Sequence, residues 1–101
     1  MTRQEIIAIF RHHEAELKAV GVVSVSLFGS AARGESDFHD IDVAVRLDRN
    51  FSDGGIDYFW QRELLRENLS KLFGRKVDLV EEPVRKPEFQ REIDKDRAIV
   101  F

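Results

Sequence analysis

The segment LFGSAARGESDFHDIDVAV, residues 27–45, contains the pattern that decides the fold. It joins one apolar run, through a short polar turn, to a second apolar run that holds Asp40 and Asp42. Side chains two residues apart in a β-strand point to the same face, so the two aspartates project together while Ile41 and Val43 point into a core. The segment therefore predicts two strands joined by a turn, with paired carboxylates on one face of the second strand.

The same segment combines acidic side chains with groups that suit a phosphate. Two carboxylates this close repel each other, and a divalent cation with oxygen ligands is the common remedy. Gly29 lets the backbone approach closely, and Ser30 begins an expected helical turn, where it can cap the turn or help to bind phosphate. Arg33 can contact triphosphate oxygens, or it can pair with Glu35 or Asp37 in solvent. Together these residues predict nucleotide chemistry at a metal ion.

The pattern of Gly-Ser, about ten residues and then Asp-x-Asp in an apolar strand resembles the signature of the nucleotidyltransferase superfamily with the polymerase beta-like fold. The fuller string GSAARGES…DIDVAV is similar to its smallest branch, the minimal nucleotidyltransferases, which act as MntA-type antitoxins paired with HEPN-type ribonuclease toxins. The resemblance covers nearly the whole chain. It implies a third acidic residue on a later strand, and Asp78 in the run KVDLV is the candidate. His39 stands where many relatives have serine, a departure that leaves the metal ligands intact.

The resemblance implies a reaction in which AMP moves from ATP to a hydroxyl of a partner toxin, often a tyrosine. We hypothesise that Asp40 and Asp42 hold two Mg²⁺ ions with the triphosphate, and that Asp78 ligates the ion that binds the acceptor hydroxyl. Asp78 is also a candidate base for the proton of that hydroxyl. Gly29 and Ser30 would hold the β and γ phosphates, and pyrophosphate would leave.

The three aspartates also have a structural interpretation that involves no chemistry. Asp40 and Asp42 could face solvent on an edge strand, as is common in antiparallel sheets. Aspartate is a poor strand former, however, and two on one face destabilise a strand without a charge partner, which favours metal ligation. Asp78 could instead pair with Lys76 or Arg75. Its position in an apolar run of the expected strand favours the metal site.

Composition limits the class of protein. With 101 residues the chain, 1–101, is a single domain, and it is small for an enzyme that must also hold a macromolecule, so a partner protein or a second copy is expected. The net charge of −3, with 35% charged residues, favours free nucleotide triphosphate over stable binding of duplex nucleic acid. The absence of cysteine excludes disulfides, thiolate metal sites and a thiol nucleophile. The first residues lack the apolar core of a signal peptide, and no apolar run approaches a membrane span, so a cytoplasmic protein is expected.

Hydrophobic periodicity and turn residues predict an α/β (α+β) fold, a small mixed β-sheet with helices mainly on one face. The order matches the polymerase beta-like nucleotidyltransferase fold that the resemblance implies. The expected elements are a helix over 2–20, a strand over 22–28, a helical turn over 30–34, a strand over 40–47, a mobile loop over 48–55, a helix over 56–73, a strand over 77–81, a helix opened by Pro87 and a strand over 97–101.

Several aromatic residues lack an evident place in this plan. Tyr58, Phe59 and Trp60 cannot all face one side of a helix, so some aromatic surface is expected to be exposed unless another chain covers it. Core packing is the simplest explanation of Trp60. Phe38, Phe51 and Phe59 are candidates for stacking on a nucleobase or for contact with a partner.

Two further classes of function compete with the protein adenylyltransferase. The chain could be a catalytically silent binding module that keeps the fold and neutralises a toxin by contact alone. The intact Gly-Ser pair and the three aspartates argue against lost catalysis. An aminoglycoside-type nucleotidyltransferase is the third interpretation, and it is disfavoured because such enzymes usually carry another domain to hold the drug.

Overall fold

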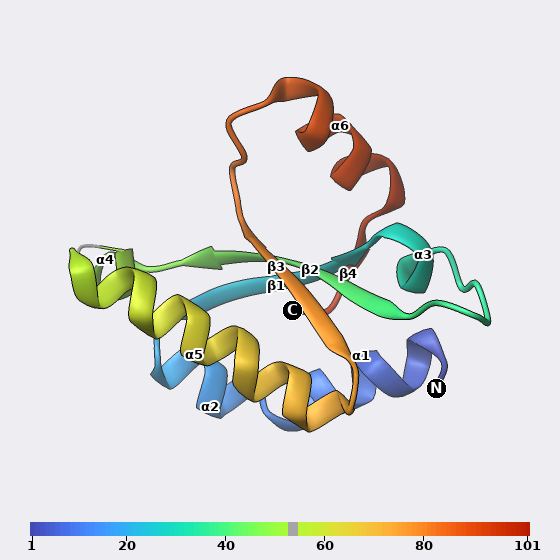
Figure 1. Cartoon of the computed structure of the whole chain (residues 1–101), viewed down its shortest axis with the longest axis horizontal. Helices are drawn as coiled ribbons and strands as arrows, with labels where there is room; N and C mark the ends of the chain where they lie inside the picture. The colour runs from blue at the N-terminus through green and yellow to red at the C-terminus, as the bar shows by residue number, and fades with distance from the viewer. Residues whose placement is uncertain (53–54) are drawn as a thin grey trace.

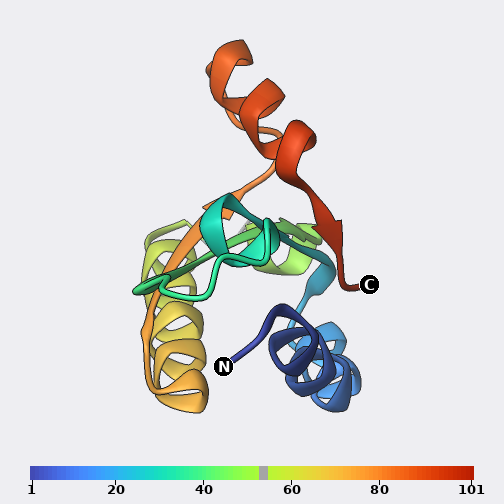
Figure 2. The same ribbon diagram turned by 90° about the vertical axis from the view of Figure 1, so that its right-hand side faces the viewer.

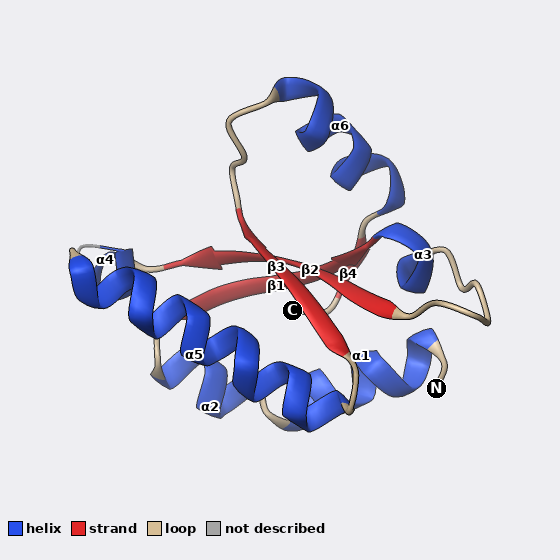
Figure 3. Ribbon diagram, in the orientation of Figure 1, coloured by secondary structure: helices blue, strands red, loops and turns tan. Residues whose placement is uncertain are grey.

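A four-stranded mixed sheet runs through the centre of the molecule, in the order β3-β2-β1-β4 (Figures 1 and 3). The computed structural model describes residues 1–52 and 55–101. The elements are α1 (Arg3–His12), α2 (Glu14–Ala19), β1 (Val22–Phe28), α3 (Gly29–Ala32), β2 (Asp40–Leu47), α4 (Arg49–Ser52), α5 (Ile56–Phe73), β3 (Lys76–Glu81), α6 (Pro87–Asp96) and β4 (Ala98–Ile99). β2 and β3 are parallel, whereas β1 is antiparallel to β2 and to β4. The predicted α/β class with a mixed sheet is confirmed.

The helices cover the two faces of the sheet unequally. α1, α2 and α5 lie on one face, and α6 lies on the other (Figures 1 and 2). Phe10 of α1 and Phe73 of α5 meet in the large core on the first face, with ring centroids 4.9 Å apart. The core on the second face is small and centres on Phe28, Ala44 and Ile93. Helices gather mainly on one face, as the sequence predicts, and the other face keeps room for polar side chains.

Local signals in the sequence set several element boundaries. Thr2 caps α1 by accepting a hydrogen bond from the Glu5 N–H at 3.2 Å. Gly74 ends α5 in the left-handed conformation, with φ of 65°, which glycine adopts without a Cβ penalty. Pro87 stands at the start of α6, where a missing N–H removes no helical bond. β1 and β2 occupy the predicted ranges.

Two predicted elements are wrong. The single helix over 2–20 is broken at His13, whose backbone (φ −102°, ψ 12°) leaves the helical region, and the bend keeps both Phe10 and Leu17 in the core. The loop over 48–55 contains the short helix α4. The Asp48 carboxylate accepts the Phe51 N–H at 3.0 Å, and the buried Phe51 ring anchors the turn. The predicted loop also includes residues 53–54, which lie outside the described residues.

The aromatic predictions need a similar correction. Trp60 is 70% exposed, so it is not a core residue, whereas Phe59 is exposed as one of the three aromatics was expected to be. Phe38 and Phe51, proposed for stacking or partner contact, are buried core residues. The buried residues of α5 repeat every four positions at Leu65, Leu69 and Phe73, and Trp60 lies well off that stripe.

No helix within residues 1–52 and 55–101 has both the length and the apolar character needed to cross a membrane.

Candidate active site

The three predicted aspartates lie on one face of two neighbouring strands. In the parallel register of β2 and β3, Asp42 is directly beside Asp78, and Asp40 is beside Lys76. Paired residues on adjacent strands point to the same face, and their strands are about 5 Å apart. Asp42 also pairs with Phe28 of β1, whose ring belongs to the small core under α6. The carboxylates therefore occupy the face opposite the α1, α2 and α5 layer.

The electrostatics of Asp42 reflect this arrangement. Partial burial raises the pKa of its carboxyl above the ordinary value, and repulsion from Asp78 and then from Asp40 adds to the rise. Arg33 and Lys76 oppose the rise through their positive charge. The negative charges of Asp78 and Asp40 thus both oppose the ionisation of Asp42. A bound cation would relieve this repulsion.

Gly29 brings the end of β1 against the same carboxylate. Its backbone has φ of 71°, a conformation that favours glycine, and a Cβ at this position would overlap the Oδ2 atom of Asp42. Ser30 follows as the second residue of α3 and is half-buried. The predicted Gly-Ser turn therefore adjoins the predicted carboxylates.

The three aspartates fit a divalent cation in the chemistry of their ligands, and they lie on one face of two adjacent strands. The oxygen ligands of three aspartates suit Mg²⁺, and the repulsion of Asp42 by Asp78 and Asp40, which adds to the effect of burial on its pKa, reflects the negative charge that a cation would offset. The carboxylates are not assembled around one point, because in the described part of the chain no three histidine, cysteine, aspartate or glutamate side chains are arranged to hold a metal ion. The Nζ atom of Lys76 lies 3.5 Å from Asp78, so a cation would have to replace that ion pair.

Arg33 is held by two carboxylates. Its Nη1 atom donates to Asp96 of α6 at 2.7 Å, and its Nε atom donates to Glu35 at 2.8 Å. Of the two solvent partners that the sequence offered, Glu35 is the one used, and Asp96 comes from a distant part of the chain. Arg33 would have to leave these partners to bind a triphosphate, although its charge already acts on Asp42.

Reasoning from the sequence missed the ion pair that holds α6 beside the site. Glu82 is buried, and Arg97 donates to it from Nη1 at 2.9 Å and from Nη2 at 2.5 Å. Arg97 also donates to the Ser26 hydroxyl of β1 at 2.9 Å, and Gln90 of α6 donates to Glu82 at 2.7 Å. The hydrogen bonds from Arg97 and then from Gln90 lower the pKa of the Glu82 carboxyl, although burial opposes them. No local pattern reveals these partners, because they are far apart along the chain.

Comparison with protein families gives a match to the nucleotidyltransferase domain over residues 6–100. Comparison with curated proteins gives no significant match.

Solved structures share the fold. One, described as a minimal nucleotidyltransferase, is 24% identical with a TM-score of 0.74, over 97% of this chain and 95% of that chain. A mutant MntA–HpeT toxin–antitoxin structure is 18% identical with a TM-score of 0.62, over 100% of this chain and 73% of that chain. A toxin–antitoxin structure with AMP-PNP is 20% identical with a TM-score of 0.62, with the same coverage of 100% and 73%.

Proposed function

The chain belongs to the nucleotidyltransferase domain family, and from this premise we propose that it transfers AMP from ATP to a hydroxyl of a partner protein with the help of Mg²⁺. The observation that carries the proposal is the position of Asp42 on β2, which lies beside Asp78 of β3 on one side and against Gly29, the residue after β1, on the other. A phosphate-binding turn and two carboxylates in one row suit a triphosphate flanked by an acceptor.

Each of the five site residues has a role in the proposed reaction. Asp40, Asp42 and Asp78 would hold two Mg²⁺ ions, which when bound offset the charge of the triphosphate and make the acceptor hydroxyl easier to deprotonate. Gly29 and Ser30 would bind the β and γ phosphates, and Asp78 would accept the proton of the acceptor hydroxyl. The hydroxyl oxygen forms a bond to the α-phosphorus as the bond to the bridging oxygen breaks. Pyrophosphate leaves, and AMP stays on the acceptor.

The proposed partner is a HEPN-type ribonuclease toxin, which would make this chain an antitoxin. One solved structure with the same fold is a toxin–antitoxin structure with AMP-PNP, an analogue of ATP. That structure supports ATP as the proposed donor and a toxin as the proposed partner of this chain. One fold can host several functions, so the acceptor must be identified by its modification.

The experiment is mass spectrometry of the protein encoded by the neighbouring gene, after incubation with this chain, ATP and Mg²⁺. We expect one or more AMP masses on that protein, none after chelation with EDTA, and recovery when Mg²⁺ is restored. Asp40→Asn/Asp42→Asn should abolish the added mass. Asp37→Asn/Asp57→Asn, which removes the same charge at exposed positions, should leave it unchanged.

A silent binding module is the second candidate function. The observation that favours it is the ion pair between Lys76 and Asp78, which keeps the third carboxylate engaged in the free chain. If the partner is bound and silenced equally by the wild type and by Asp40→Asn/Asp42→Asn, with no added mass in either case, the enzymatic proposal is wrong and the binding module stands.

A further inference from the structure

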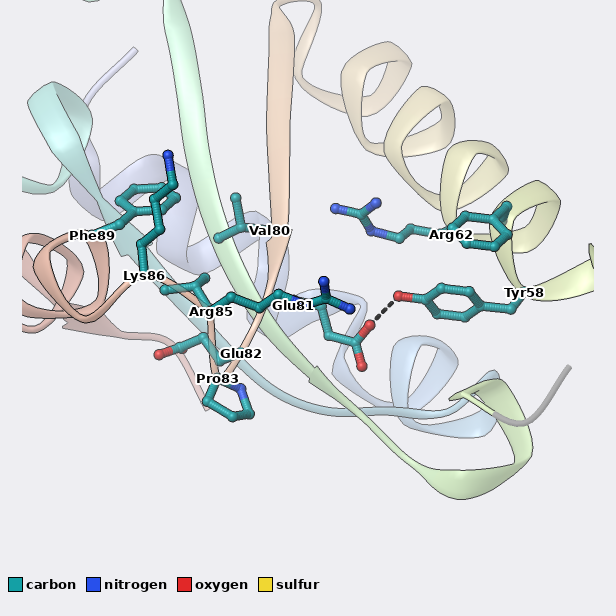
Figure 4. A pocket seen from close by; sticks show the side chains of 11 residues that line it. Tyr58, Arg62, Val80, Glu81, Glu82, Pro83, Arg85, Lys86 and Phe89 are labelled. Atoms are coloured by element: carbon teal, nitrogen blue, oxygen red, sulfur yellow. Dashed lines mark hydrogen bonds between the residues drawn. The ribbon is translucent and has the colours of Figure 1, made fainter. Parts of the chain in front are cut away.

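A surface pocket of about 600 Å³ opens beside β3, between α5 and α6 (Figure 4). We call it the β3-edge pocket, defined by Tyr58, Phe59 and Arg62 of α5, by Arg85 and Lys86 of the connection after β3, and by Phe89 of α6. β3 is an outer strand of the sheet, so the pocket lies at the side of the molecule. None of these residues has a role in the proposed reaction.

The pocket lies on the side from which the acceptor would approach in the proposed reaction. Gly29 at the end of β1, Asp42 on β2 and Asp78 on β3 follow one another, so in the proposed reaction the phosphates would lie toward β1 and the acceptor hydroxyl toward β3. Val80 lines the pocket and shares a face with Asp78, about 7 Å further along the same strand. A segment held in the pocket can therefore present a side chain to Asp78.

Positive charge dominates the pocket in a chain whose net charge is −3. Arg62, Arg85 and Lys86 line it together with Glu81 and Glu82. Glu82 is neutralised by Arg97, which is not a lining residue, and this leaves three positive charges against Glu81. The charge balance favours an acidic ligand.

Arg62 adds a donor that lacks an acceptor. Its Nη2 atom donates to the Leu79 carbonyl at 2.9 Å, which fixes the guanidinium against β3. Its Nε atom is buried and has no hydrogen-bond partner within the described residues. A buried donor is normally satisfied, and the Arg62 side chain would have to turn toward the pocket for an oxygen-rich ligand to accept from this atom. Arginine matches the two oxygens of a carboxylate especially well.

The remaining walls are apolar. Phe59 is 68% exposed, and the rings of Tyr58 and Phe89 stand on opposite sides of the opening (Figure 4). A small inorganic anion would use the charges but leave this apolar surface uncovered, whereas a peptide covers both. We propose that the β3-edge pocket binds an acidic peptide segment of the acceptor protein and so positions its hydroxyl beside Asp78. The proposal rests on the proposed function and adds where, and by what chemistry, the acceptor binds.

The probe is an acidic random copolymer of glutamate and tyrosine. A basic copolymer of lysine and tyrosine, with the opposite charge, is the control. Binding is measured by fluorescence anisotropy, and transfer is measured with ATP labelled at the α-phosphate. We expect the wild type to bind the acidic copolymer and not the basic one. Arg85→Glu/Lys86→Glu should weaken binding and transfer by about ten-fold or more, since several charges of one ligand are affected. Both residues are exposed.

Arg49→Glu/Arg91→Glu is the matched control, because it reverses two exposed charges outside the pocket. It should bind the acidic copolymer within about two-fold of the wild type. Arg85→Ala/Lys86→Ala, with thermal unfolding recorded for every variant, separates charge reversal from misfolding and should show a smaller loss of the same kind. The affinity for AMP-PNP with Mg²⁺ should be the same in all of these variants.

Three results would overturn the proposal: no binding of the acidic copolymer by the wild type, equal losses in pocket and control variants, or weakened AMP-PNP binding in the pocket variants alone. The last would assign the pocket to the nucleotide. Failure of the proposed function looks different. In that case the wild type binds the acidic copolymer through Arg85 and Lys86, but no label is transferred to it or to the neighbour-encoded protein.

Discussion

The two faces of the sheet divide stability and chemistry between them. On the face covered by α1, α2 and α5, side chains such as Ile6, Phe10 and Ile41 are fully buried in one large apolar core. On the face under α6, the core is small, and the same strands present Asp40, Asp42 and other charged groups. Apolar burial is the dominant favourable term in folding, so the first face supplies most of the stability.

The difference teaches why so small a chain can hold repelling carboxylates. Side chains alternate along each strand, so Ile41 and Val43 pack into the large core while Asp40 and Asp42 face the other way. The cost of the acidic cluster is offset by packing on the reverse side of the same strand. Substitutions on the first face should therefore change stability, and substitutions on the second should mainly change chemistry.

The largest effect is expected for Phe10→Ala on the first face. Phe10 is fully buried and packs against Phe73, so its truncation should lower the free energy of unfolding by about 4 kcal/mol. Urea unfolding measures the loss, with Phe59→Ala at an exposed position as the control. The molecules that remain folded should keep AMP transfer. A loss of less than about 1 kcal/mol would break the division between the faces.

Glu82→Gln tests the ion pair that holds α6 over the second face. Removing the charge that pairs with Arg97 should lower the free energy of unfolding by about 2–3 kcal/mol at neutral pH. The fold lowers the pKa of Glu82 below its ordinary value of 4.5. The stabilisation is therefore full above pH 4.5 and is lost as the pH falls through the lowered pKa.

The measurement is unfolding of the wild type and of Glu82→Gln between neutral and acidic pH. The two should converge in acid, because protonation of Glu82 removes the same charge as the substitution. Glu88→Gln, at an exposed position of α6, should follow the wild type throughout. A gap between the wild type and Glu82→Gln that stays constant into acid would contradict the charge-pair explanation.

Gly29→Ala should lower both the stability of the fold and the rate of AMP transfer. The left-handed backbone should cost about 1–2 kcal/mol with any side chain, and the new methyl group would also displace the Asp42 carboxylate. Gly34→Ala is the control, since Gly34 has φ of 78° and no atom within 4 Å of an added Cβ. Both variants should lose stability, but only Gly29→Ala should lose AMP transfer. Equal AMP transfer by Gly29→Ala and Gly34→Ala would show that Gly29 is not part of the active site.

The smallest effect is expected for Asp42→Asn, and it has the opposite sign. Removing the charge relieves the repulsion by Asp78 and Asp40, so the variant should be about 0.5 kcal/mol more stable than the wild type without Mg²⁺. Added Mg²⁺ should raise the melting temperature of the wild type and leave Asp42→Asn unchanged. Asp37→Asn, at an exposed position, should behave as the wild type in both conditions. A loss of stability in Asp42→Asn would indicate that the carboxylate is a structural group.

Local pattern was sufficient for much of the fold. The alternation of valines in β1 and β2, the apolar stripe of α5 and the capping role of Thr2 all depend on neighbours within a few residues, and they predict the bounds of these elements well. The same alternation predicts that Asp40 and Asp42 share a face. A prediction failed where the same local pattern suits two structures. The polar residues of 48–52 were expected to form a loop, but they form a short helix that the Asp48 carboxylate caps.

The sequence by itself determined the class of fold, the shared face of Asp40 and Asp42, and the family signature in residues 27–45. Only the tertiary structure decided that Asp78 stands beside Asp42, that Arg33 pairs with Asp96, and that Trp60 is exposed while Phe51 is buried. The reason is physical. Strand register, ion pairs between distant residues and burial depend on which segments pack together, and that choice is made by the whole chain rather than by neighbouring residues.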